Sequence, residues 1–176
     1  MVNGKKQSGE TVLEAQEIRR TAITQLNALG ITGPDIYLVD LIPLLEMIWA
    51  DGKVQEMELE ILEHYLPNHV TAINRLAEYN ILTLERAKKF VKQFLQTRPD
   101  QNLLKTLRSL VYDARYAVEG NPINDAIRQS LLTLCIDIGA AAVTQYPFGL
   151  SERFNPEEKR CFFEILDTLG ENRNKD

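Results

Sequence analysis

Apolar residues recur every three or four positions along most of this chain, which is the spacing of an α-helix with one buried face. No segment alternates apolar and polar residues in the way that predicts a β-strand. Glycines, prolines and capping residues separate the apolar segments, as expected where helices end and start. The pattern predicts eight helices, over residues 9–28, 32–50, 55–66, 68–80, 83–97, 99–118, 122–145 and 155–170.

Two prolines set expected features of individual helices. Pro43 predicts a kink in the helix over residues 32–50, and Pro67 predicts the end of the helix that opens near Gln55. The loops between the predicted helices are short, which favours helices packed antiparallel to their neighbours. We therefore expect an all-α fold, a compact helical bundle that forms a single domain over residues 1–176.

The helices that open near Gln55 and Asn155 share one spacing of apolar residues. Counted from Glu58 and from Glu158, apolar residues follow at the same four offsets. Upstream, DLIPLLEMIWADG aligns with DIGAAAVTQYPFG, which places Asp40 on Asp137. Any two amphipathic helices share the same period of apolar residues, so that match alone is weak evidence for a repeat. The aligned acids, aromatics and glycines on either side are the stronger evidence. It predicts two related helical hairpins, over about residues 36–66 and 122–169, that cover each other's apolar faces around a pseudo-twofold axis.

Composition and charge narrow the classes of protein. The chain is 44% hydrophobic and 26% charged, as in globular proteins, and its net charge of −5 disfavours nucleic acid as a partner. Cys135 and Cys161 form no C-x-x-C motif and predict buried, reduced thiols, with a redox pair as the alternative. Apolar stretches fall short of the roughly 18 residues that a membrane span needs, and no signal-peptide pattern is present. We expect a cytoplasmic location.

The segment MIWADGKVQEMELEIL, residues 47–62, resembles the second half of a calcium-binding loop. With Gly52 at position 6 of such a loop, Asp51 takes position 5 and Glu58 takes position 12, the place of the ligating glutamate. Positions 1 and 3 would be Met47 and Trp49, which offer no oxygen, so an ordinary EF-hand is excluded. The spacing still allows Asp51 and Glu58 to share one ion, and oxygen ligands favour calcium or magnesium over zinc.

These acids also have structural interpretations. Asp51 suits a turn in which its side chain bonds its own backbone, and Glu58 lies where negative charge offsets the dipole of a helix. Asp40 lies about 16 Å from Asp51 along a straight helix, so it can join a second ion site only if the fold brings it to Asp137.

No catalytic motif is present, so we predict that the chain is not an enzyme. Glu60 and His64 lie one helical turn apart and could share a zinc ion, but a solvated histidine is the favoured interpretation. The basic residues of 86–98 lie opposite an apolar face. They predict a solvated helix surface, with an acidic partner or an anionic membrane surface as the alternatives.

The segment LVDLIPLLEMIWADGKVQEMELEILEHYL, residues 38–66, resembles the tellurite-resistance TerB-like family of all-helical domains. The family's mark is a helix that ends in A-D-G, a short turn, and a following helix that opens with a glutamate. In this chain the mark consists of Ala50, Asp51, Gly52 and Glu58. The family is built from a duplicated helical unit, as the internal repeat predicts here. The second unit departs from the mark, because Phe148 precedes Gly149 where an aspartate is expected.

The resemblance implies a role in tellurite or other chemical stress, a divalent cation, and a protein partner associated with the membrane. Carried onto this sequence, the implied metal ligands are Asp40, Asp51, Glu58, Asp137 and Glu158. The alternative function is an all-α interaction scaffold, or a homodimer, in which no metal takes part.

Overall fold

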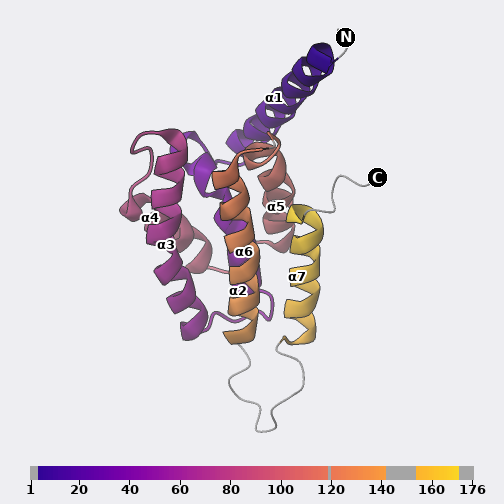
Figure 1. Ribbon diagram of the computed structural model, residues 1–176. Helices are drawn as coiled ribbons and strands as arrows, with labels where there is room; N and C mark the ends of the chain where they lie inside the picture. The colour runs from indigo at the N-terminus through magenta and orange to yellow at the C-terminus, as the bar shows by residue number, and fades with distance from the viewer. Residues whose placement is uncertain (1–3, 119, 142–153, 171–176) are drawn as a thin grey trace.

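The computed structural model describes residues 4–118, 120–141 and 154–170, with side-chain burial from residue 11 onward, and these residues form helices without any strand (Figure 1). The predicted all-α class is confirmed. The described part has seven α-helices and one 3₁₀ helix: α1 (Gly4–Ala28), η1 (Gly33–Leu41, the 3₁₀ helix), α2 (Ile42–Ile48), α3 (Glu56–Ala77), α4 (Leu84–Leu95), α5 (Gln101–Arg115), α6 (Pro122–Ala141) and α7 (Pro156–Leu169).

Helix α3 runs through Pro67, so the predicted end of a helix at that residue is wrong. Pro67 lies on the exposed side of the helix, where water can bond the backbone carbonyl that the proline leaves without a partner. Leu66 and Val70 on either side are buried in the core, and their packing favours one continuous helix. The helix ends instead after Ala77, where Glu78 adopts a left-handed conformation with φ of 62°.

The predicted kink at Pro43 is a change of helix type. Residues Gly33–Leu41 form the 3₁₀ helix η1, and α2 begins at Ile42. Pro43 therefore occupies the first turn of α2, where the missing N–H has no intrahelical partner to lose.

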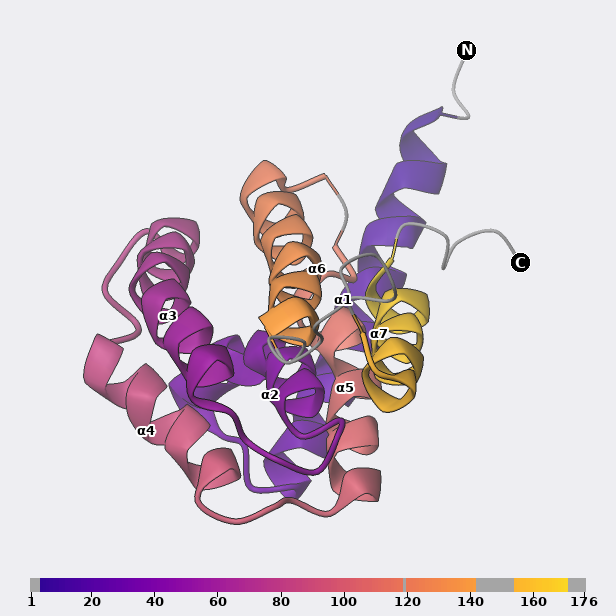
Figure 2. The ribbon, with the colours of Figure 1, turned by 90° about the horizontal axis from the view of Figure 1, so that it is seen from below.

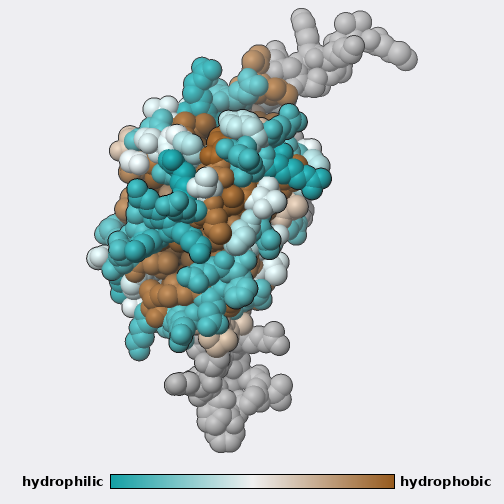
Figure 3. Space-filling view, turned by 90° about the vertical axis from the view of Figure 1, so that its left-hand side faces the viewer, coloured by the Kyte–Doolittle hydropathy of each residue, from teal (hydrophilic) through white to brown (hydrophobic). Residues whose placement is uncertain are grey.

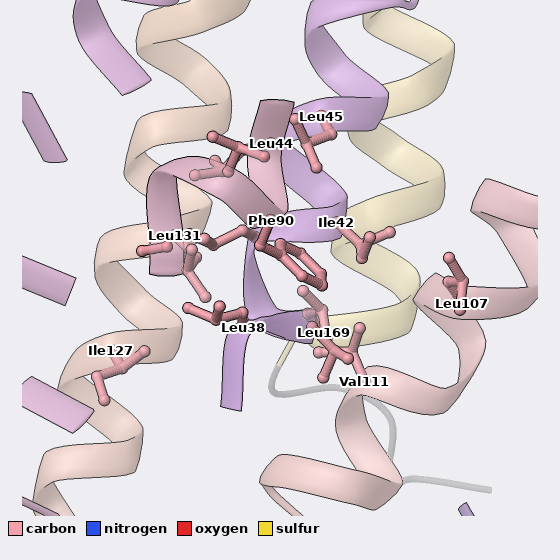
Figure 4. Packing of buried hydrophobic residues seen from close by; sticks show 14 of the residues in the cluster. Leu38, Ile42, Leu44, Leu45, Phe90, Leu107, Val111, Ile127, Leu131 and Leu169 are labelled. Carbon is pink, nitrogen blue, oxygen red and sulfur yellow. The ribbon is translucent and has the colours of Figure 1, made fainter. Parts of the chain in front are cut away.

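Helix α2 lies at the centre of the molecule. All seven of its residues are buried, and it contacts η1, α3, α4, α5, α6 and α7. Figure 2 shows α2 surrounded by these helices. A helix that is apolar on nearly every side belongs in the interior. Figure 4 shows its side chains meeting those of η1 and of the surrounding helices, at Leu38, Ile42, Leu44, Leu45, Phe90, Leu107, Val111, Ile127, Leu131 and Leu169.

Helix α1 packs on α5 and extends beyond the rest of the bundle (Figure 1). Within the described residues, no single helix has both the length and the apolar composition to cross a membrane. One bent pair, Thr11–Ala28 with Gly33–Ile48, meets those two criteria jointly, with 97° between its halves.

The basic residues of α4 lie on its outer face, as the sequence predicts. Lys88, Lys89 and Lys92 are exposed, while Ala87 and Phe90 are buried. The side of the molecule formed by α3 and α4 is mostly hydrophilic, with apolar patches between the polar side chains (Figure 3).

Gly139 lies at a close approach between α6 and two side chains from other parts of the chain. A Cβ atom added there would overlap the ring of Phe154 and lie 3.0 Å from the terminal methyl group of Met47. Gly139→Ala is therefore expected to lower the free energy of unfolding by about 1–2 kcal/mol, because overpacking outweighs the better helix propensity of alanine. Urea unfolding measures this loss. In a Phe154→Leu background the loss should shrink, and an equal loss in both backgrounds would contradict the close contact.

Candidate functional site

Two glutamates occupy the same position in the first turn of their helices and make the same capping hydrogen bond. Glu58 is the third residue of α3, and its Oε2 accepts a hydrogen bond from the Gln55 backbone N–H at 2.8 Å. Glu158 is the third residue of α7, and its Oε2 accepts from the Asn155 N–H at 3.0 Å. Asn155 completes a reciprocal capping box, since its Oδ1 accepts from the Glu158 N–H at 2.9 Å. Both glutamate residues are only 1% exposed.

The starts of α3 and α7 lie at the same end of the bundle, the lower end in Figure 1, which faces the viewer in Figure 2. The turn that follows α2 lies at this end as well and carries Asp51. We call Asp51, Glu58 and Glu158 the acidic end. The sequence predicted all three as site residues, and the structure brings them to one region of the molecule.

The three carboxylates of the acidic end influence one another. Burial raises the pKa of Glu58 to about 7, the bond from the Gln55 N–H opposes that shift, and the negative charges of Asp51 and Glu158 add to it. Burial also raises the pKa of Glu158, and the charges of Asp51 and Glu157 act in the same direction. Oε1 of Glu158 is buried without a hydrogen-bond partner among the described residues. A cation placed among these three carboxyl groups would oppose these shifts and favour their ionised forms.

Asp51 lies in a tight turn and uses both carboxylate oxygens there. Its Oδ1 accepts from the Lys53 N–H at 2.9 Å, and its Oδ2 accepts from the Gln55 side-chain amide at 3.4 Å. Gly52 has φ of +83°, which favours glycine, and the guanidinium of Arg98 lies beside it. The turn role predicted for Asp51 is present. An ion at the acidic end would have to draw Asp51 away from these hydrogen bonds.

Asp40 lies in the interior and has different partners. Its Oδ1 accepts from Nε of Arg115 at 2.8 Å, and its Oδ2 accepts from the Tyr116 hydroxyl at 3.1 Å. Asp40 is fully buried, and the side chain of Arg115 is only 2% exposed. Asp137, its counterpart in the sequence repeat, is exposed on α6. The two acids therefore have unlike surroundings. Asp40 is the counter-ion of the buried Arg115.

A hydrogen bond and a buried ion pair fix the C-terminal end of α2, and the sequence only partly indicates these contacts. Trp49, the residue that follows α2, donates from Nε1 to the backbone oxygen of Phe94 at 2.9 Å. One turn earlier, Glu46 accepts from the buried Arg108 at 2.8 Å, and Arg108 also bonds Glu164 of α7 at 3.2 Å. Burial raises the pKa of Glu46 to about 7 even though Arg108 opposes that shift. In the sequence, the signal for this ion pair is Glu46, an acid within the otherwise apolar segment that forms α2.

The remaining candidate ligands have other roles. Nδ1 of His64 lies 2.8 Å from the backbone oxygen of Glu60, so the backbone of its own helix already occupies one of the two ring nitrogens. Cys135 is buried and Cys161 is half-buried, and both thiols are free. Across the part of the chain that the structure describes, no three histidine, cysteine, aspartate or glutamate residues are already arranged to hold a metal ion.

Comparison of the chain with protein-family models, with curated proteins and with solved structures finds no match. The resemblance to the TerB-like family therefore remains a prediction from the residues of the A-D-G segment.

Proposed function

We propose that this chain is a non-enzymatic, TerB-like helical module that binds a divalent cation at its acidic end and presents that end to a protein partner in a chemical stress response. The observation that carries the proposal is the meeting of Asp51, Glu58 and Glu158, carboxylates from one turn and two separate helix starts, in one electrostatic cluster. Their oxygens are the ligands that calcium and magnesium prefer.

The ion would act as a link between two helical units. Glu58 comes from the unit that contains α2 and α3, and Glu158 comes from the unit that contains α6 and α7. The two glutamates share a position in their helices, which supports an internal duplication. Oε1 of Glu158 is the natural first ligand, because it has no hydrogen-bond partner among the described residues while Oε2 of each glutamate caps its helix. Asp51 would join it by giving up one of its turn hydrogen bonds.

Titration with calcium or magnesium, followed by the amide NMR signals, tests the proposal. We expect millimolar ion to shift the signals of Asp51, Glu58 and Glu158. Asp51→Asn and Glu58→Gln should weaken binding at least about tenfold, since each removes one charge from an oxygen-ligand site. Glutamine can still cap α3, so Glu58→Gln preserves the local fold.

Glu56→Gln is the matched control, because Glu56 is an exposed acid in the same first turn of α3. It should leave the affinity unchanged. If none of the three signals moves at millimolar calcium or magnesium, the ion site is refuted.

The alternative is an interaction scaffold without a metal, and the projecting α1 favours it. Val12, Leu13 and Ile18 on this helix are 48%, 66% and 48% exposed, so the helix offers apolar surface to a partner. A partner that binds Asp51→Asn and Glu58→Gln as tightly as the unchanged chain would favour the scaffold over the cation-dependent module.

A further inference from the structure

A small cleft lies between the end of α2, the start of α5 and the first half of α7, and we call it the α5–α7 cleft. Its volume is about 70 Å³. One water needs about 10–15 Å³, so the cleft has room for a group of several heavy atoms. Glu46 in its wall is buried, whereas Arg98 and Arg160 are exposed, so the cleft opens to solvent beside the two arginines.

The two arginines come from different parts of the chain and have no counter-ion. Arg98 lies in the turn between α4 and α5, and Arg160 lies on α7. Neither forms an ion pair with any residue that the structure describes. A Cβ atom added at Gly52 would lie 3.1 Å from Nη1 of Arg98, so this guanidinium packs against the turn that follows α2. Both guanidinium groups are therefore available to donate hydrogen bonds to a molecule in the cleft.

Most of the other charges around the cleft are paired. Glu46 bonds Arg108 at 2.8 Å. Glu164 lies 3.4 Å from Lys105 and 3.2 Å from Arg108. Glu157 is the one acid of the cleft wall that has no ion pair in the described part of the chain. Because the two unpaired arginines outnumber this one unpaired acid, the cleft carries an excess of positive charge.

Two helix starts add to this preference for an anion. Gln101 is the first residue of α5, and Glu157 is the second residue of α7, and both line the cleft. The dipole of a helix is positive at its start, where negatively charged groups are stabilised. The helix dipoles and the unpaired arginines therefore act in the same direction.

We propose that the α5–α7 cleft binds the phosphate group of a small phosphate-bearing molecule. A phosphate group offers at least three oxygens, so the forked donors of Arg98 and Arg160 can both bond it. A carboxylate has only two oxygens and would be bonded fully by one guanidinium. Trp49 and Leu104 in the wall offer apolar surface to the rest of the molecule. The proposal does not depend on a cation at the acidic end.

The test uses glycerol 3-phosphate and inorganic phosphate as probes, titrated into the full chain in metal-free buffer at constant ionic strength. Trp49 is the only tryptophan of the chain and lines the cleft, so its fluorescence reports binding. We expect both probes to give a saturable change in the millimolar range. Acetate should bind at least about fivefold more weakly, because it bonds one arginine in place of two. Tighter binding of the ester would assign a phosphorylated small molecule, and equal binding would assign free phosphate.

Substitutions of opposite sign separate this site from nonspecific binding. Arg98→Gln and Arg160→Gln should each weaken glycerol 3-phosphate about fivefold to tenfold, because each removes a charged donor. Glu157→Gln should tighten binding several-fold, because it removes the acid that repels the phosphate, and a gain in affinity does not arise from misfolding. Arg75→Gln is the matched control, since it removes an exposed arginine at the end of α3, outside the cleft, and should leave the affinity unchanged.

Four results would each overturn the proposal. They are no binding at several millimolar probe, equal affinity for acetate and the phosphates, an unchanged affinity in either cleft arginine variant, and weaker binding in Glu157→Gln.

Discussion

Replacing Asp40 with asparagine is expected to lower the free energy of unfolding by about 3–5 kcal/mol, measured by urea unfolding with Trp49 fluorescence as the probe. The substitution keeps the shape of the side chain and removes its charge. Arg115 is then left as a buried cation without a counter-charge, since its side chain is only 2% exposed. The loss comes from that uncompensated guanidinium more than from the lost hydrogen bond at 2.8 Å.

Asp137→Asn is the matched control, because it makes the same chemical change at the aligned position of the sequence repeat. Asp137 is exposed, so the change in unfolding free energy should stay within about 0.5 kcal/mol. A loss below about 1 kcal/mol for Asp40→Asn, or equal losses for the two variants, would show that Asp40 is not a structural counter-ion.

The second large effect is a loss of stability as the pH rises from about 4.5 to about 7. The folded state raises the pKa of Glu58 from 4.5 to about 7, mainly through burial. Between these pH values the folded protein holds a proton that the unfolded chain has released. The folded state is therefore favoured at the lower pH, and its stability falls as the pH rises. At about 1.4 kcal/mol for each pKa unit, Glu58 accounts for about 3 kcal/mol of this loss, measured by urea unfolding at a series of pH values.

Glu58→Gln should flatten the pH dependence, because glutamine keeps the cap on α3 and does not titrate. Some slope should remain, since burial also raises the pKa of Glu46 to about 7. Glu56→Gln should retain the full slope. An equally steep loss of stability in Glu58→Gln and in the unchanged chain would mean that Glu58 ionises at its ordinary pKa.

Helix starts were predictable where the signal is local. Asn155 and Pro156 set the start of α7 within one residue of its observed position, because a cap and a first-turn proline act only on their own helix. The prediction of a helix end at Pro67 was wrong for the opposite reason. Whether a proline ends a helix depends on which side faces water and on how well its neighbours pack, and both are properties of the tertiary structure.

The acidic end shows the same division between local and distant signals. The spacing of Asp51 and Glu58 follows from one turn and one helix start, so the sequence identified both. Glu158 was found through the repeat. The partner of Asp40 was not, because Arg115 lies 75 residues away and no local pattern links the two.

Carboxyl-carbon NMR of Glu58 and Glu158, recorded as a pH titration with and without millimolar calcium, tests the acidic end most directly. The account predicts a midpoint for Glu58 near 7 and one for Glu158 above 4.5, with both lowered by Asp51→Asn and by calcium. Midpoints near 4.5 that neither the substitution nor the ion moves would contradict it, because the three carboxylates would then not share one site.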